Sequence, residues 1–263
     1  MTSLTGKVKL WKLGITDKLW NFFERWLYGS TAHILVQGHA SDPFNISRSI
    51  KQGGLLSTFF FVGFYQDIHA YVTQGSTQAL TFHNKDVGSP TMADDTLLLS
   101  ATPKGLQTMI DNAYRYGRES RLEYSPNKTK CIVFGSKKRS NVAYQWYLGV
   151  QSLEIVTSYN YLGIVLSADG SSRHRTNVMS KKGYASLGLL KASGFHSNGL
   201  SPITCSTIWQ RLLIPSMLYG CEVWGDIPKV EINVLEVVQK RVGKHIQRLH
   251  RRTHDEIVRG LLG

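Results

Sequence analysis

The sequence lacks the features of a membrane protein, a disulfide-bonded protein or a zinc protein. No apolar run approaches the roughly 18 residues that a membrane-spanning helix needs. The three cysteines, Cys131, Cys205 and Cys221, lie far apart, and none has a Cys or His at zinc-ligand spacing. Without an evident signal peptide, this pattern favours an intracellular protein, nuclear or cytoplasmic, in a reducing setting. There is also no internal repeat and no low-complexity linker.

Acidic residues are scarce. The chain has 18 Asp and Glu against 31 Lys and Arg, a formal net charge of +13. Such an excess favours a polyanionic partner, either nucleic acid or an anionic membrane. No isolated basic amphipathic segment or lipidation signal is present, so nucleic acid is favoured over a membrane.

The 263 residues are 42% hydrophobic and 19% charged, which is typical of a globular protein with a core. Strand and helix patterns alternate up to about residue 170, and the pattern is helical thereafter. The fold class is therefore predicted to be α+β, with a first part at 1–170 and a helical part at 171–263. The predicted helices span residues 7–28 with a break at Gly14, 55–72, 103–122, 172–192, 202–219 and 231–249.

Thr102 and Pro103 are the predicted N-cap and first residue of the helix at 103–122. The predicted strands are shorter and rich in β-branched residues. They span residues 31–37, 44–50, 79–83, 90–100, 130–135, 153–156 and 159–166.

The most informative segment is Thr91–Leu99, in which Asp94 and Asp95 stand between two short apolar runs. This pattern predicts a hairpin with Asp-Asp in its turn. Adjacent carboxylates repel each other unless a cation such as Mg²⁺ binds them. Two metal ions held in this way would catalyse nucleotidyl transfer. An ordinary Asp-rich turn is the alternative interpretation.

The C-terminal part is strongly basic. It contains Lys240, Arg241, Lys244, Arg248, Arg251 and Arg252. These residues suit either phosphate contacts or a solvated helix face stabilised by the helix dipole, and the sequence leaves both open. The nearby His245, His250 and His254 fit a solvated face better than a metal site.

Several segments, in this order, resemble the reverse transcriptase of non-LTR retrotransposons. They are Trp11–Ile15 (the helix after motif A), Arg48–Ser57 (motif B), Met92–Asp95 (motif C), Asn127–Phe134 (motif D), Tyr159–Ile164 (the primer grip) and Pro215–Gly225 (the stretch after the polymerase core). The resemblance covers nearly the whole chain. It implies a partial right-hand polymerase palm with fingers, followed by an all-helical thumb.

The resemblance also implies roles for individual residues. Asp94 would be the main ligand of Mg²⁺ (or Mn²⁺), and Asp95 a second ligand or an orienting group. Lys128 would lie near the leaving pyrophosphate. The template and nucleotide would meet Arg48, Gln52 and Gly53, and the primer end would meet Tyr161, Leu162 and Gly163. The implied partners of the intact parent are an RNA template, a DNA primer and a deoxynucleoside triphosphate.

One departure from the family pattern matters most. The motif A carboxylate should precede the helix at Leu10–Ile15, yet no Asp or Glu occurs before Asp17. Asp94 and Asp95 supply one side of a two-metal site, so we expect little or no polymerisation by this chain. The alternatives are a non-catalytic nucleic-acid-binding remnant, or an unselected reading frame of a decayed element.

Overall fold

The computed structural model of the chain describes residues 4–27, 31–46, 54, 56–75, 80–135, 144–192, 194, 199–223, 225 and 227–260. The chain divides into two compact units. Unit 1 comprises Met1–Thr129 and Tyr144–Leu153, and unit 2 comprises Lys130–Ala143 and Glu154–Gly263. The functional boundary predicted at residue 170 falls inside unit 2 and stays a prediction.

Unit 1 mixes helices with short antiparallel hairpins. Its helices are α1 (Leu4–Lys12), α2 (Asp17–Leu27), α3 (Ser57–Tyr65), α4 (Ile68–Thr73) and α5 (Pro103–Ser120). Its strands are β1 (Thr31–Ala32), β2 (Leu35–Val36), β3 (His39–Ala40), β4 (Phe44–Asn45), β5 (Thr81–Phe82), β6 (Lys85–Asp86), β7 (Thr91–Met92), β8 (Asp95–Thr96), β10 (Tyr147–Leu148) and β11 (Gln151–Ser152). The pairs are β1–β4, β2–β3, β5–β6, β7–β8 and β10–β11.

Unit 2 has two small sheets and a helical bundle. Its strands are β9 (Lys130–Cys131), β12 (Glu154–Ile155), β13 (Ser158–Tyr161) and β14 (Ile164–Ser167), with β9–β12 parallel and β13–β14 antiparallel. Its helices are α6 (Arg173–Ala192), α7 (Pro202–Ile208), η1 (Trp209–Leu213), α8 (Ile214–Met217), η2 (Cys221–Val223), α9 (Lys229–Ile246) and α10 (Asp255–Gly260). The α+β class is compatible with this mixture of elements.

Local sequence signals predicted the boundaries of several helices well. Gly14, with φ +82°, separates α1 from α2. The Thr102 hydroxyl accepts a hydrogen bond from the Gly105 amide at 3.1 Å, so Thr102 caps α5 as predicted. Arg121, with φ +56°, ends α5 in the left-handed conformation. Most predicted strands are present but shorter than expected. The strands predicted over 31–37 and 159–166 need correction, because each is divided into two: β1 and β2 in the first, and the β13–β14 hairpin in the second.

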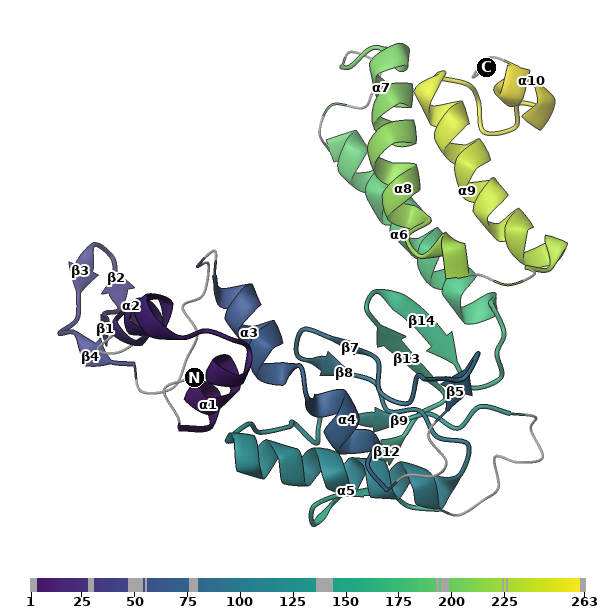
Figure 1. The fold of residues 1–263 in the computed structure, drawn as a ribbon. Helices are drawn as coiled ribbons and strands as arrows, with labels where there is room; N and C mark the ends of the chain where they lie inside the picture. The colour runs from purple at the N-terminus through teal and green to yellow at the C-terminus, as the bar shows by residue number, and fades with distance from the viewer. Residues whose placement is uncertain are drawn as a thin grey trace. The chain divides into compact units, whose positions relative to one another are not determined.

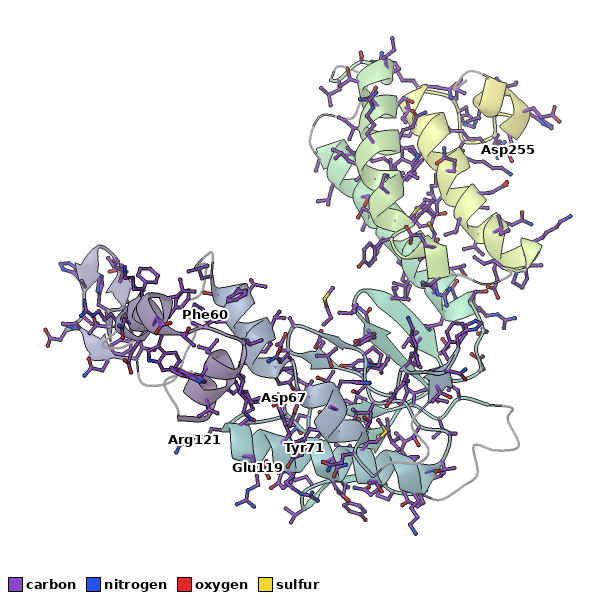
Figure 2. All side chains as sticks on the ribbon, viewed as in Figure 1. Phe60, Asp67, Tyr71, Glu119, Arg121 and Asp255 are labelled. Atoms are coloured by element: carbon purple, nitrogen blue, oxygen red, sulfur yellow. The ribbon has the colours of Figure 1, made fainter. Side chains whose placement is uncertain are left out.

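The prediction of one continuous helix over 55–72 was wrong, because α3 and α4 are separated at Gln66 and Asp67. The interruption places Asp67 where it meets α1 and α5. Its carboxylate accepts hydrogen bonds from Lys9 Nζ at 2.8 Å and from the Tyr116 hydroxyl at 2.7 Å. Figure 2 labels Asp67 beside α4.

Lys9 is the centre of this polar cluster. Its side chain is 12% exposed, and Nζ also donates to the Phe64 carbonyl at 3.0 Å. The ammonium lies 4.4 Å from the Tyr116 ring centroid. Partial burial raises the pKa of Asp67, but hydrogen bonds from Lys9 and Tyr116 outweigh it, and the net pKa is lowered. Burial and the Asp67 carboxylate raise the pKa of Tyr116.

Apolar packing surrounds the polar cluster. Buried residues of α3, α4 and α5 form one core: Phe64, Tyr65, Ile68, Val72, Met109, Ala113 and Tyr116. A second cluster joins α1, α2 and α3 through Leu10, Ile15, Phe23 and Phe60. Phe23 and Phe60 meet edge to face, with ring centroids 4.7 Å apart. The two helices that supply hydrogen-bond donors to Asp67, α1 and α5, are therefore also held by this packing.

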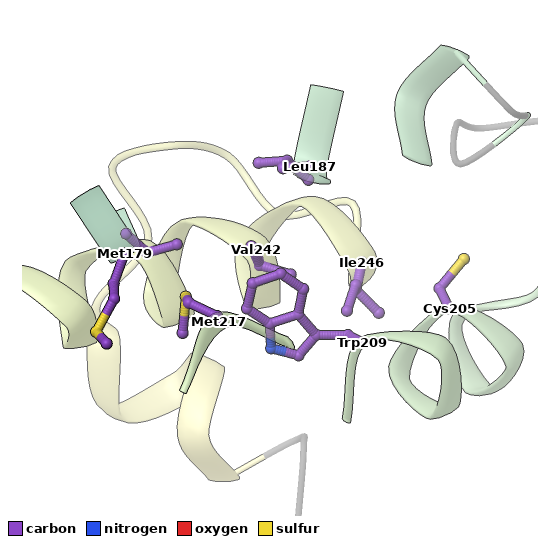
Figure 3. Close-up of a cluster of buried hydrophobic side chains, with 8 residues drawn as sticks. Met179, Leu187, Cys205, Trp209, Met217, Val242 and Ile246 are labelled. Carbon is purple, nitrogen blue, oxygen red and sulfur yellow. The ribbon is translucent and has the colours of Figure 1, made fainter. Parts of the chain in front are cut away.

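The bundle of unit 2 is built around Trp209, which is 2% exposed. Figure 3 shows the indole among Met179, Met217, Val242 and Ile246. Its Nε1 donates to Gln239 Oε1 on α9 at 2.6 Å, so the buried indole N–H is paired. Gly183 lets α6 approach α9 closely, because a Cβ there would lie 2.7 Å from Val238 Cγ1. Figure 1 shows α6, α8 and α9 side by side.

The helix predicted at 202–219 is present with a local change of pitch. A wider turn, η1, joins α7 to α8, and the Ile214 amide there donates to the Trp209 carbonyl. Pro215 follows directly and has no amide hydrogen to continue the ladder. In the part of the chain that the structure describes, no helix is both long and apolar enough to cross a membrane.

We predict that Lys9→Met destabilises unit 1 by about 1–2 kcal/mol, since Asp67 loses a charged donor but remains half exposed. Lys12→Met, an exposed lysine of the same helix, should change stability by less than about 0.5 kcal/mol. Hydrogen exchange of α5 amides in urea would measure both.

The destabilisation caused by Lys9→Met should also depend on pH. The pKa of Asp67 is below its ordinary 3.8 in the folded state. The ion pair therefore contributes fully above that pH and is lost as the pH falls through the lower, folded-state value. A Lys9→Met effect that stays the same at pH 7 and pH 2.5 would contradict the assignment.

Candidate active site

The two acidic residues lie at the tip of the β7–β8 hairpin, whose register pairs Thr91 with Thr96 and Met92 with Asp95. The prediction that both aspartates form the turn needs correction. Ala93 and Asp94 occupy the two turn positions, and Asp95 is already the first residue of β8. Ala93 has φ +52°, as the first position of a tight hairpin turn requires. A non-glycine residue there costs of order 1 kcal/mol, which the hairpin below must offset.

The base of this hairpin is well anchored. The Leu97 amide donates to the Pro90 carbonyl at 2.9 Å, and the Leu99 amide donates to the Gly88 carbonyl at 2.7 Å. Leu98 packs against the core of α3, α4 and α5. Asp94 and Asp95 are both exposed at the tip. The arrangement presents two carboxylates to solvent from a fixed base.

These carboxylates are suitable for part of a Mg²⁺ site. Mg²⁺ prefers hard oxygen ligands and is usually held by one or two carboxylates together with substrate phosphates. Among the described residues, no group of three or more His, Cys, Asp or Glu side chains could hold a metal ion. Asp94 and Asp95 could therefore bind a cation that phosphate completes, but a two-metal site needs further ligands.

Lys128 lies in a turn between α5 and β9, and its side chain is exposed. The turn is closed by the Lys128 amide, which donates to the Ser125 carbonyl at 3.1 Å. Thr129 donates to the same carbonyl through its amide and its hydroxyl, at 3.0 Å and 2.8 Å. The turn holds the backbone of Lys128 in place. The contact of its ammonium group with the leaving pyrophosphate stays a prediction.

Arg48, Gln52 and Gly53, the predicted template and nucleotide contacts, lie outside the described residues. The helix expected after them is present, since α3 begins at Ser57.

The predicted primer grip is a hairpin of unit 2. Tyr161 ends β13, Leu162 and Gly163 form the turn, and Ile164 begins β14. Both turn residues have positive φ, +49° and +82°, which is the geometry of the commonest two-residue hairpin turn. The three predicted residues are thus contiguous at one hairpin tip.

The tip of this hairpin packs against a corner that follows α8. A Cβ on Gly163 would lie 3.1 Å from the Tyr219 ring, and a Cβ on Gly220 would lie 2.8 Å from Ile164 Cγ1. A hollow of about 500 Å³ lies at this contact, lined by Ile164, Pro215, Leu218, Tyr219, Gly220, Cys221, Glu222 and Val223. Two segments of the family resemblance, some 50 residues apart, therefore meet.

The structure distinguishes between the basic residues at the C-terminus. Asp255, labelled on α10 in Figure 2, accepts from Lys240 at 3.1 Å and from Lys244 at 2.9 Å. Hydrogen bonds from these lysines lower the pKa of Asp255, so it stays ionised. Arg241 lies over the Tyr184 ring. Part of this basic run therefore stabilises the packing of α9 and α10.

A basic surface that the sequence interpretation did not single out lies on α6. The helix contains five Lys and Arg and no acidic residue. Thr176, Met179, Gly183 and Leu187 are buried. The exposed residues of the helix include Arg173, His174, Lys181, Lys182 and Lys191. The sequence signal was available, because no Asp or Glu occurs between residues 173 and 192.

The chain is similar to three known proteins of Drosophila melanogaster. They are the RNA-directed DNA polymerase from mobile element jockey (25% identical over 255 residues), the probable RNA-directed DNA polymerase from transposon BS (22% over 255 residues) and the retrovirus-related Pol polyprotein from type-2 retrotransposable element R2DM (26% over 244 residues). The matches cover 89–90% of this chain but 21–27% of the relatives. The chain thus spans about a quarter of their length. No protein-family model matches it.

The contact between hairpin tip and corner gives a prediction with a matched control. Gly220 (φ +78°) and Gly170 (φ +69°) are both left-handed, but a Cβ on Gly170 meets nothing within 4 Å. Gly170→Ala should cost about 1 kcal/mol through backbone strain alone, and Gly220→Ala should cost about 1–3 kcal/mol more through overlap with Ile164. Urea unfolding of unit 2 measures both.

A double-mutant cycle identifies the source of the difference. In an Ile164→Ala background the side-chain overlap is gone, so the effect of Gly220→Ala should approach that of Gly170→Ala. Equal effects of the two glycine substitutions in the wild-type background would mean that the corner does not support the hairpin tip.

Proposed function

We propose that this chain is the reverse transcriptase portion of a non-LTR retrotransposon. Over 90% of its length it is homologous to RNA-directed DNA polymerases of such elements. The observation that carries the proposal is the acidic hairpin. It presents Asp94 and Asp95, the residues to which the resemblance assigns metal binding, to solvent.

In this proposal, residues 1–170 correspond to a partial palm with fingers, and residues 171–263 to the thumb. The packing of the acidic hairpin on α4 and α5 supports the first assignment. The bundle of α6, α8 and α9 around Trp209 supports the second. The right-hand arrangement itself is an inference from the resemblance.

The proposed mechanism belongs to the intact parent polymerase. Bound divalent metal ions would there activate the primer hydroxyl and stabilise the leaving oxygen. Asp94 would hold the metal from the hairpin tip, and Asp95 would add or orient a ligand. Lys128 neutralises charge on the pyrophosphate. The resemblance assigns template and nucleotide contacts to Arg48, Gln52 and Gly53, and the Tyr161–Gly163 tip would position the primer end.

We expect a protein made of these 263 residues alone to extend primers little or not at all. Two carboxylates supply one side of a two-metal site. Among the described residues, no third candidate ligand joins them.

A second candidate function is nucleic-acid binding without catalysis, and the surface of α6 favours it. No carboxylate of the described residues forms an ion pair with Lys181 or Lys182. Their charges are available to phosphates, whereas those of Lys240 and Lys244 are offset by Asp255. Each phosphate neutralised by such a lysine releases a counterion, so binding weakens with salt.

Primer extension tests the first candidate. An RNA template with an annealed DNA primer, deoxynucleoside triphosphates and Mg²⁺ or Mn²⁺ should give little or no product with this chain. Asp94→Ala is the matched control. Template-dependent extension that Asp94→Ala abolishes would show that the chain is itself a polymerase and would overturn the expected inactivity.

The salt dependence of RNA binding tests the second candidate. The pairs Lys181→Gln/Lys182→Gln and Lys240→Gln/Lys244→Gln remove the same formal charge. The slope of log affinity against log salt should fall by about 1–2 for the α6 pair and by less than about 0.5 for the α9 pair. Equal changes, or a wild-type slope near zero, would contradict a phosphate-binding surface on α6.

A further inference from the structure

A histidine of α4 contacts both ends of the turn that leads into the acidic hairpin. His69 Nδ1 shares a hydrogen bond of 2.8 Å with the Ser89 hydroxyl. On the other side of the ring, Nε2 lies 3.7 Å from the Asp86 carboxylate. Ser89 is 2% exposed, so its hydroxyl depends on a protein partner.

Ser, His and Asp are the residue types of nucleophilic hydrolases, but this geometry excludes that chemistry. A nucleophile must reach substrate, and Ser89 is buried. The carboxylate distance of 3.7 Å is also too long for the hydrogen bond that orients a catalytic imidazole. The cluster must serve another purpose.

The backbone around Ser89 indicates that purpose. Asp86 Oδ1 accepts from the Gly88 amide at 2.7 Å, which closes the turn. The Gly88 carbonyl accepts from Leu99, and the Pro90 carbonyl accepts from Leu97. Ser89 lies between these two rungs, so its position sets the base of the β7–β8 hairpin. Asp94 follows five residues later.

The other end of the connection is rigid. His69 lies on α4, where its neighbours Ile68 and Val72 are 2% and 0% exposed in the core with α5. The Thr73 hydroxyl donates to the His69 carbonyl at 2.9 Å. The imidazole therefore joins a fixed helix to the base of the hairpin.

We propose that His69 is a positioning residue for the acidic hairpin, holding Ser89 so that Asp94 and Asp95 are presented from a rigid base. The functional meaning of this role rests on the proposed function of the two carboxylates. The physical connection does not, and it can be tested separately.

Hydrogen exchange of the full chain is the test. In His69→Ala, loss of one partly buried hydrogen bond should make the Leu97 and Leu99 amides exchange about three- to tenfold faster. Amides of α9 in unit 2 should be unchanged. The matched control is His39→Ala, which removes an exposed histidine of β3 in the same unit.

His69→Asn separates the hydrogen bond from the helix. The Asn amide reaches the position of Nδ1 and keeps a bond to Ser89, but Asn is a poorer helix former than Ala. If His69 positions Ser89, the Leu97 and Leu99 amides exchange slowly in His69→Asn and fast in His69→Ala. If the residue at position 69 affects only the stability of α4, these amides exchange at least as fast in His69→Asn as in His69→Ala, and the proposal is overturned.

Wild-type exchange in both variants would also overturn the proposal. None of these outcomes depends on primer extension or on Asp94→Ala. A failure of the proposed catalytic role therefore remains distinguishable from a failure of the connection.

Discussion

The ammonium of Lys9 is the interaction on which unit 1 depends. It is largely removed from water and joins three segments that are far apart in the sequence: α1, the junction of α3 with α4, and α5. A buried cation is costly unless it is paired and hydrogen-bonded, and Asp67, Tyr116 and the Phe64 carbonyl provide this. These contacts lie at the junction where α3 ends and α4 begins. Because α4 carries His69, the hairpin of Asp94 and Asp95 is ultimately held by this polar cluster.

Unit 2 depends instead on an apolar centre. Trp209 fills the space between α6, α8 and α9, and its one polar side-chain atom is paired with Gln239. The corner at Tyr219 and Gly220 follows from the same bundle and supports the β13–β14 tip. The two hairpins important to the proposed function are thus held in different ways, one by a polar cluster and a histidine, the other by close apolar contact.

Charge has two separate uses in the bundle. Along α9 and α10, opposite charges are brought together, and Asp255 offsets two lysines. Along α6 the exposed residues include cations, and the helix has no acidic residue. Pairs of the first kind connect α9 to α10 and mask the charge of the lysines. Unmasked cations of the second kind keep a long-range attraction for a polyanion. The net charge of +13 therefore does not act uniformly over the chain.

Local signals in the sequence determined several features. Thr102 and Pro103 started α5, Gly14 separated two helices, and the segment around Asp94 formed a hairpin, because caps, turns and alternation act over a few residues. Tertiary structure decided the rest. The break at Asp67, the masking of Lys240 by Asp255 and the bond between His69 and Ser89 all involve partners brought together by folding. Propensity describes a residue and its neighbours along the chain, whereas these features depend on burial and charge contributed by distant segments.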